Sequence, residues 1–355
     1  GEGRGHATRA RALVEELRPE HHVHLFASGD AYDLLLDVFD DTEVRLMQIP
    51  CLRFCYTRRH RLSYLKTGKE ALGYLMRLPG LIRMFVDEIQ EHRPELVITD
   101  FEPALPRAAR RCQIPFLSVD HQHFLTVSDF RGVSRFLRVF AWAVGPIINW
   151  FYHGQQESIV SSFFFPPLKS TCEKVTQVGV MLRPEILQAN PSDERFLLCY
   201  LRRDVPPHVL ETLQSAPMPV KIYGLGERPV EGNLEFCAIH EQGFLEDLIR
   251  CHAVVCTAGN QLVGESLYLR KPVLGLPEQG NFEQHINAHF LRESRCGDWM
   301  KMKHFNPATL QSFLDKVEEH RANIEPERVN GNRPTLDIIR RYLPVRETVL
   351  EVEVL

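Results

Sequence analysis

Short apolar runs alternate with helical patterns along most of the chain, and this alternation constrains the fold more than any other feature. Strand-like runs of the first half lie at residues 22–27, 44–49, 95–101 and 114–119, and helical patterns lie at residues 7–20, 32–39 and 62–90. The last of these helices is expected to break near Pro79 and Gly80. Such alternation is typical of a parallel sheet covered on both faces, so it predicts an α/β, doubly wound fold.

The second half repeats this alternation. Its strand-like runs lie at residues 195–201, 220–223, 234–237, 253–256 and 272–276, and its helical patterns at residues 209–214, 243–250, 260–269, 282–293 and 307–320. Because 355 residues exceed what one core usually holds, we expect two Rossmann-like domains, at residues 1–182 and 183–329, facing each other across a ligand cleft. Residues 330–355 contain a short amphipathic helix, which is expected to pack back onto the first domain.

Composition narrows the class of protein. The net charge of −4 gives no global reason to expect nucleic-acid binding. The nine cysteines are odd in number and scattered, which is typical of free thiols in a reducing cytosol. No apolar stretch is long enough to span a bilayer, and no signal peptide is visible. The chain begins inside a glycine-rich loop without an initiator Met, so we expect that a first β-strand is missing from this numbering.

Residues 257–265 form the first candidate site. They follow the apolar run at residues 253–256 and open a helix, and a small-residue turn there leaves backbone N–H groups able to bind a phosphate. Glu265 lies about a turn and a half along that helix, where its carboxylate can accept two hydrogen bonds from a ribose diol. The segment therefore predicts a nucleotide-sugar pocket, although an ordinary strand–turn–helix connection explains the same pattern equally well.

The amino-terminal loop, residues 1–9, is the second candidate site. Its glycines allow a ligand to approach the backbone, and Arg4 and Arg9 can face a phosphate or an anionic acceptor. His6 stands at the start of a helix and can act as a general base, because its ordinary pKa lies near neutrality. Asp100, which ends a predicted strand, is the expected partner of His6. The alternatives are a helix-start histidine without a function and an Asp100 that caps the following helix.

Asp120, His121 and His123 mark the end of the next strand. They can bind an acceptor, and the spacing Asp-His-x-His is also compatible with a metal ion. Because this spacing by itself is weak evidence, we expect no metal site.

Four segments together resemble the GT-B glycosyltransferases, in particular the inverting group that includes the UDP-glycosyltransferases and the peptidoglycan lipid-linked GlcNAc transferase. Gly5-His6 is similar to that group's acceptor loop, and residues 97–101 are similar to the strand whose Asp partners the catalytic His. Residues 178–184 resemble the interdomain crossover. The donor signature is matched by Gly259, Glu265, Lys271-Pro272-Val273, Pro277, Glu283-Gln284 and Asn287-Ala288. The resemblance covers nearly the whole chain and is strongest at residues 239–292.

The resemblance implies roles for residues of the donor half. Gly259, Asn260 and Gln261 would hold the diphosphate, and Glu265 would hold the ribose hydroxyls. The other implied donor-side residues are Glu283 and Gln284 for the sugar hydroxyls and Phe244, or the backbone near Ile239, for the base. On the acceptor side, Gly5 belongs to the loop that the resemblance implies, and Arg4, Arg9 and His121 are the further candidate residues.

The chain also departs from the family pattern. Thr257 stands where the plant-type signature has a His, and Leu262 stands where it has a Ser, so phosphate binding is expected to depend on backbone amides. Arg202 and Arg203 replace a small-residue turn; they either supply positive charge to the leaving diphosphate or form a surface pair.

Together these features predict an inverting glycosyltransferase with a UDP-linked donor, because the resembling families mostly use UDP. His6, oriented by Asp100, would take the proton from an acceptor hydroxyl, with no cofactor and no obligatory metal. Two alternatives stay open. One is a nucleotide-sugar 2-epimerase of the same architecture, and the other is a sugar-nucleotide-binding protein without turnover.

The acceptor is suggested only by two basic and aromatic segments, at residues 51–84 and 130–152. Such surfaces can meet a lipid-linked or otherwise anionic acceptor, which would place a cytoplasmic protein peripherally on the inner membrane face. The alternative is a solvated basic helix beside an ordinary aromatic core.

Overall fold

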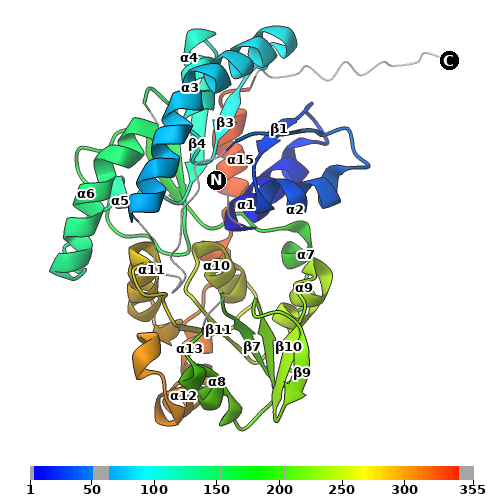
Figure 1. Ribbon diagram of the computed structural model, residues 1–355, viewed down its shortest axis with the longest axis vertical. Coiled ribbons are helices and arrows are strands. Elements are labelled where there is room, and N and C mark those ends of the chain that lie inside the picture. Colours follow the sequence, from blue (N-terminus) through cyan, green and yellow to red (C-terminus); the bar gives the residue numbers. More distant parts are fainter. Residues whose placement is uncertain (1–3, 51–63, 152, 203–204, 344–355) are drawn as a thin grey trace.

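The computed structural model describes residues 4–50, 64–151, 153–202 and 205–343. Figure 1 shows two α/β bodies stacked along the long axis of the molecule, with the amino-terminal half above and the carboxy-terminal half below. The fold is the predicted pair of Rossmann-like units, each with parallel strands and flanking helices.

The amino-terminal half contains two sets of parallel strands. β1 (His24–Ala27) pairs with β2 (Arg45–Gln48), and a second sheet has the order β3-β4-β5-β6. The strands of this second sheet are Val97–Thr99, Phe116–Asp120, Glu157–Ser161 and Val175–Val178. The helices are α1 (Arg4–Leu17), α2 (Asp30–Phe39), α3 (Tyr64–His92), α4 (Ala104–Arg111), α5 (Phe124–Val127) and α6 (Arg135–Phe151).

The carboxy-terminal half is built on one seven-stranded sheet of order β13-β12-β11-β7-β8-β10-β9. Its strands in chain order are β7 (Leu197–Tyr200), β8 (Val220–Tyr223), β9 (Arg228–Glu231), β10 (Leu234–Cys237), β11 (Ala253–Cys256), β12 (Val273–Gly275) and β13 (Gly297–Trp299). All pairs are parallel except β9 with β10. The chain order reverses between β7 and β11, and ligands of doubly wound sheets bind at such a switch point. The predicted phosphate turn follows β11 directly.

Helices cover this sheet and then return to the first half. They are α7 (Pro184–Leu187), α8 (Pro207–Gln214), α9 (Glu241–Arg250), α10 (Asn260–Tyr268), α11 (Phe282–Glu293), α12 (Pro307–Leu314), α13 (Val317–Ala322), α14 (Pro326–Val329) and α15 (Asn332–Arg340), with a short 3₁₀ helix at Met302–His304. Figure 1 shows α15 running up beside α1. Leu336 and Ile339 of α15 share a buried cluster with Ala12 and Leu13 of α1, so the carboxy-terminal helix packs on the first half.

The crossover between the halves, residues 178–184, and the chain that returns to the first half, residues 329–331, contact each other along their backbones. The Val180 N–H donates to the Val329 carbonyl at 2.8 Å, and the Gly331 N–H donates to the Val180 carbonyl at 2.9 Å. A Cβ on Gly331 would lie 2.0 Å from the Gly179 carbonyl oxygen, so the two segments pass as closely as backbones can. The proposed domain boundary at residues 182 and 183 lies next to this crossing and stays a prediction.

Two predicted features of local structure were wrong. α3 continues through Pro79, because Leu78, Leu81, Ile82 and Phe85 on both sides of it are buried in one cluster. Their burial outweighs the roughly 3 kcal/mol that a proline costs inside a helix. The glycine-rich loop also ends early, since α1 begins at Arg4 and places His6 in its first turn.

We predict that Gly331→Ala destabilises the protein, because backbone atoms have to separate to admit the new Cβ. The expected loss in the free energy of unfolding is about 1–3 kcal/mol, as for other overpacked sites. Gly80→Ala is the matched control, since its Cβ meets nothing within 4 Å, and an exposed helical glycine gains up to about 1 kcal/mol on this change. Equal melting temperatures for the two variants, measured by circular dichroism, would contradict the close crossing.

Candidate active site

A large cavity lies between the two halves of the molecule. Its volume is about 1780 Å³, which includes a part that continues between β1 and β3. The first half contributes His6, Arg9, Asp100, Phe101, His121 and Gln122 to its lining, and the second half contributes Arg202, Phe244, Gly259, Gln261, Glu278 and Glu283. The two predicted candidate sites therefore face one common space.

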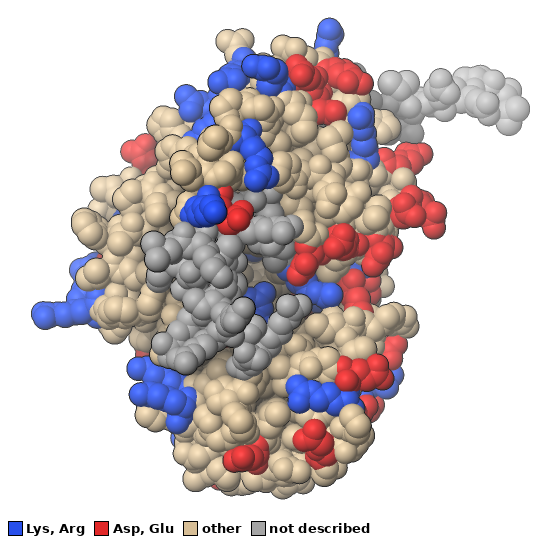
Figure 2. All heavy atoms as spheres, in the orientation of Figure 1, with Lys and Arg blue, Asp and Glu red and all other residues tan. Residues whose placement is uncertain are grey.

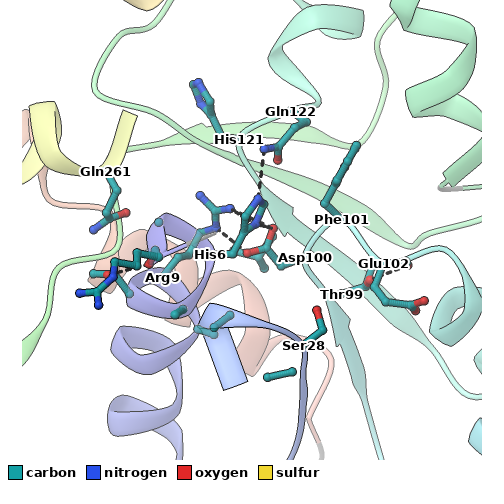
Figure 3. A pocket seen from close by; sticks show the side chains of 18 of the residues that line it. His6, Arg9, Ser28, Thr99, Asp100, Phe101, Glu102, His121, Gln122 and Gln261 are labelled. Atoms are coloured by element: carbon teal, nitrogen blue, oxygen red, sulfur yellow. Dashed lines mark hydrogen bonds and ion pairs between the residues drawn. The ribbon is translucent and has the colours of Figure 1, made fainter. Parts of the chain in front are cut away.

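His6 and Asp100 contact each other at the centre of this cavity (Figure 3). His6 Nδ1 lies 2.9 Å from Asp100 Oδ1, although the two residues are 94 positions apart. Arg9 Nη2 also lies 3.0 Å from His6 Nδ1. Because a carboxylate only accepts hydrogen bonds, the tautomer with its proton on Nδ1 bonds Asp100 and leaves Nε2 as the basic nitrogen, and Arg9 Nη2 then donates to Asp100 alone. The Gln122 amide nitrogen lies 3.5 Å from Nε2.

Arg9 shares the Asp100 carboxylate with His6. Its Nε donates to Asp100 Oδ2 at 3.0 Å, and its Nη2 donates to Oδ1 at 2.9 Å. The Arg9 side chain is buried, so the guanidinium that was expected to face an anionic acceptor is held by Asp100 instead. Arg9 lies one helical turn after His6, and this spacing brings both side chains to the same face of α1.

The charges of this cluster are set by burial and by each other. Burial lowers the pKa of His6, and the adjacent Asp100 carboxylate counteracts this only in part. Burial would raise the pKa of Asp100, but the Arg9 guanidinium and His6 hold it well below its usual range. At neutral pH the cluster therefore consists of an ionised Asp100, a charged Arg9 and a neutral His6, which is the form that can accept a proton.

Asp100 does not cap the helix that follows it. The Glu102 carboxylate accepts the N–H groups of Ala104 at 2.9 Å and Leu105 at 2.6 Å at the start of α4. Phe101, between the two acids, has a φ of 51°, which is uncommon for a residue with a side chain. The backbone turn at Phe101 thus separates the two carboxylates. Glu102 caps the start of α4, and Asp100 faces the cavity.

The phosphate turn lies on the opposite side of the cavity. Gly259 is the N-cap of α10 and offers no side-chain cap, and Ala258 before it has a φ of 61°. The Asn260 side chain donates to the Ser161 carbonyl at 3.1 Å, and the Gln261 amide nitrogen donates to the Met181 carbonyl at 2.7 Å. These two side chains therefore tie the turn to the crossover region, while the backbone of the first helical turn is left for a ligand.

Glu265 has partners that sequence analysis did not anticipate. Arg183 donates to both of its oxygens, from Nε to Oε1 at 3.0 Å and from Nη2 to Oε2 at 2.7 Å. Gln261 Nε2 also donates to Oε1, at 3.1 Å. Glu265 is only 2% exposed, and its carboxylate, which was expected to face a ribose, already accepts from a buried guanidinium while it lines the cavity. The sequence signal for Arg183 was only its place at the crossover, before Pro184.

The ion pair extends across the molecule. Arg183 Nη1 donates to Glu241 Oε1 at 2.8 Å, and Arg11 Nη1 donates to the same oxygen at 2.7 Å. Arg11 also pairs with Glu185. Arg11 belongs to α1, Glu241 to α9 and Glu265 to α10, so this network connects the helix that carries His6 with the helix of the phosphate turn.

The remaining predicted donor-side residues all line the cavity, and Gln284 differs from the others because its side chain is bonded within the protein. Arg202, Phe244, Thr257 and Glu283 line the cavity. Burial raises the pKa of Glu283 to about 7, even though Arg9 and Arg202 favour its charged form. Gln284 also lines the cavity, but its amide bonds its own loop, with Oε1 accepting from the Glu278 N–H at 2.8 Å.

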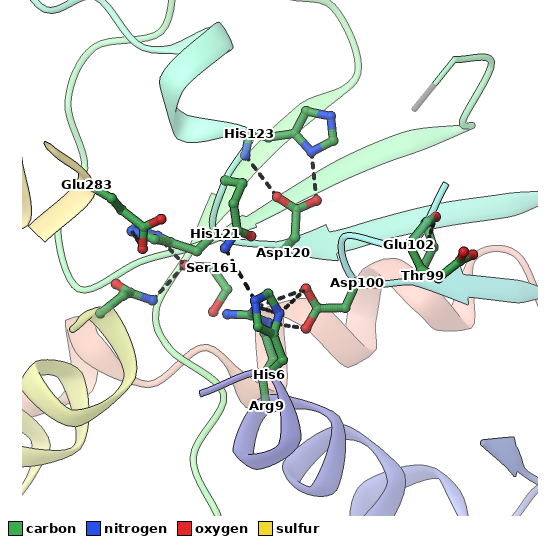
Figure 4. Close-up of polar contacts among 12 residues, drawn as sticks. His6, Arg9, Thr99, Asp100, Glu102, Asp120, His121, His123, Ser161 and Glu283 are labelled. Atoms are coloured by element: carbon green, nitrogen blue, oxygen red, sulfur yellow. Dashed lines mark hydrogen bonds and ion pairs between the residues drawn. The ribbon is translucent and has the colours of Figure 1, made fainter. Parts of the chain in front are cut away.

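The two histidines that follow β4, His121 and His123, both contact polar groups of the protein (Figure 4). His123 bonds the Asp120 carboxylate through Nδ1 at 2.7 Å, and both residues are buried. His121 lies 3.1 Å from Asn287 Oδ1 in the second half and 3.1 Å from the Ser161 carbonyl in the first. Burial lowers the pKa of His121 to about 4. The predicted acceptor residue His121 thus bridges the two halves, whereas Arg4 and Gly5 line the cavity at the start of α1.

Two Rossmann-like units around a shared cavity are the architecture of the GT-B glycosyltransferases. A sequence-family model described as glycosyl transferase family 1 matches residues 1–318, and the chain belongs to this family. No curated protein sequence matches the chain.

Solved structures share the fold at low sequence identity. The calicheamicin glycosyltransferase CalG4 is 18% identical with a TM-score of 0.68, over 98% of this chain and 97% of that one. LpCGTa, solved in complex with UDP, is 15% identical with a TM-score of 0.68, over 97% and 98% of the two chains. MurG of Acinetobacter baumannii is 14% identical with a TM-score of 0.59, over 95% and 96%.

We predict that Arg183→Met lowers the free energy of unfolding by about 3–5 kcal/mol, because Glu265 would stay buried without its cation. The double variant R183M/E265M should recover much of this loss, since it removes both buried charges. Arg333→Met is the control, because the Arg333–Asp337 pair is exposed and such pairs contribute about 0–1 kcal/mol. If R183M and R333M unfold at the same urea concentration, the buried network is not a source of stability.

Proposed function

We propose that this glycosyltransferase transfers a sugar from a nucleotide-sugar donor, with UDP as the expected nucleotide, to an acceptor hydroxyl with inversion at the anomeric carbon. The observation that carries the proposal is the His6–Asp100 pair facing the amino terminus of α10 across one cavity. A neutral base on one side and unpaired helix-end amides on the other are the two groups that such a displacement needs.

In the proposed reaction, His6 Nε2 takes the proton from the acceptor hydroxyl as its oxygen attacks the anomeric carbon. The new bond joins the acceptor oxygen to that carbon, and the bond from the carbon to the diphosphate oxygen breaks. Asp100 stabilises the imidazolium that forms. The N–H groups at the start of α10, together with Arg202, would stabilise the negative charge on the departing nucleoside diphosphate without an obligatory metal or cofactor.

The donor would lie along α10 and the loop before α11. Phe244 packs edge-on against Tyr200 and Tyr223, and this aromatic group is suited to stack against the base. Glu283 would accept from a sugar hydroxyl when ionised. Glu265 would accept from the ribose beside Arg183, since a carboxylate has about four lone-pair sites and the arginine and Gln261 occupy three.

The acceptor side of the cavity favours a partly apolar molecule. Phe101 stacks against His6 and in turn against Phe151, and the cavity lining further includes Phe140, Val144 and Ile147. This wall supports a lipid-linked or otherwise amphipathic hydroxyl acceptor. We further propose a cytoplasmic location, which is consistent with the seven described cysteines all being free thiols.

His6→Ala should lower kcat by about 10²–10⁴-fold, the usual contribution of a positioned general base. His153→Ala is a matched control, because His153 is exposed and lies outside the cavity lining.

Screening of nucleotide sugars by mass spectrometry identifies the donor, and NMR of the product establishes the anomer. A retained anomer, or near wild-type turnover in H6A, would remove His6 from the mechanism. A free epimerised sugar formed without acceptor would indicate the 2-epimerase, and binding without turnover would indicate a non-catalytic protein.

The pH dependence provides an independent test. Because the pKa of His6 is lowered, protonation of its imidazole should reduce kcat/KM only below about pH 6.5, in addition to the loss caused near pH 7 by protonation of Glu283. Asp100→Asn removes the charge that raises this pKa and keeps Arg9 nearby, so the acidic limb should move to lower pH while kcat falls. An acidic limb that moves to higher pH in D100N would exclude His6 as the titrating group.

A further inference from the structure

α6 presents an apolar face to solvent. Leu137, Ala141 and Ile148 point into the core, and Phe140 and Val144 line the cavity. On the outward side Trp142 is 79% exposed and Val139 is 61% exposed, with Trp150 at 44%. Ala143 and Pro146 are also exposed between them, so Asn149 is the only polar residue of this face beyond Arg135 and Arg138. An apolar face of this size on a surface helix marks a binding surface.

The charged residues of segment 130–156 all have one sign. Arg131, Arg135 and Arg138 are exposed at the amino end of α6, and residues 130–156 contain no Asp or Glu. Arg131 pairs with Asp129 just before this segment. Figure 2 shows a largely tan and blue surface on the left of the molecule, where α6 lies, whereas red acidic side chains gather mainly on the right. The face is therefore apolar with a basic edge.

α3 carries a second exposed apolar surface with basic neighbours, although Glu70, Asp87 and Glu91 are also exposed on this helix. Leu72 is 61% exposed and Met76 is 78% exposed, and Lys69, Arg77 and Arg83 are exposed on the same helix. α3 and α6 also share the cavity, because Tyr74 of α3 lines it together with Phe140 and Val144 of α6. Both surfaces thus belong to the walls of the acceptor side.

We propose that the outward face of α6, with Trp142 at its centre, docks onto an anionic phospholipid bilayer. Trp142 and Val139 would enter the interfacial region, and Arg135 and Arg138 would contact lipid phosphates. Indole rings favour this region because they combine a large apolar ring with one N–H donor. None of the helices in the described ranges has the length and apolar character required to cross a membrane.

A bilayer fits this face better than a second copy of the chain. A symmetric dimer through α6 would bring Arg135 and Arg138 against the same arginines or leave them at one shared edge, with no acid on the helix to pair with them. An anionic lipid surface complements the arginines and covers the tryptophans. Docking itself does not depend on the proposed transfer reaction. The functional consequence of docking does depend on that reaction, because a docked α6 would hold the acceptor side of the cavity beside a lipid-linked hydroxyl.

Flotation of the full chain with phosphatidylcholine vesicles, with or without phosphatidylglycerol, tests the proposal. The wild type should float with the anionic vesicles, and V139S/W142S should bind them about tenfold more weakly or worse. Both side chains are solvent-exposed, so the double variant should fold, and its melting temperature checks this. Val230→Ser is the matched control, since Val230 is 68% exposed on β9 in the other half. R135E/R138E should lose the preference for phosphatidylglycerol.

Trp142 fluorescence gives a second readout in the folded protein. The chain has three tryptophans, so W150F/W299F leaves Trp142 as the only emitter. Its emission should shift to the blue with anionic vesicles and be quenched by brominated lipid. Unchanged Trp142 emission, or flotation of V139S/W142S like the wild type, would overturn the proposal. A dimer that V139S/W142S disrupts, without flotation, would assign the face to a second copy instead. H6A should float like the wild type, which separates this result from a failure of the proposed chemistry.

Discussion

The buried pair of Arg183 and Glu265 anchors the charged network through which the two halves are joined. Removing two charges from water is costly, and the cost is recovered only where geometry is close and further hydrogen bonds are made. Arg183 meets both conditions, because it bonds both oxygens of Glu265 and continues to Glu241. Arg11 then bonds Glu241 from the other half. A shift of α1 relative to α9 and α7 would break both charged contacts of Arg11 at once.

The same helix α1 carries this network and the candidate base. His6 and Arg9 occupy one face and reach Asp100, and Arg11 reaches across to α9. The position of the base relative to the phosphate turn is therefore coupled to the ion network through a rigid helix. Asp100 bonds both His6 and Arg9, and these contacts set the pKa of His6. The carboxylate raises this pKa, whereas Arg9 and burial lower it.

Much of the fold and part of the site could be predicted from local patterns. The strands at residues 220–223, 234–237 and 253–256 were predicted with the observed bounds, because each is a short apolar run between turn residues. Asp100 could be proposed as the partner of His6 because residues at the ends of parallel strands share one edge of a sheet. The predicted helix break at Pro79 was wrong, because the burial of apolar side chains around α3 outweighs the tendency of proline to end a helix. β5 and β6 were missed because they lie beside the aromatic passage and the crossover.

The sequence by itself determined the α/β class, the two-fold repetition of the pattern and the residue types at the two loops, since these depend on periodicity and on local backbone preference. Tertiary structure alone decided the partners of the charged groups. Glu265 is 82 residues from Arg183, and Arg11 is 230 residues from Glu241. Ion pairs form between whichever groups the packed helices bring within about 3 Å, and nothing in the local pattern records that distance. The same holds for α6, whose aromatic residues divide between core, cavity and solvent only once its neighbours are in place.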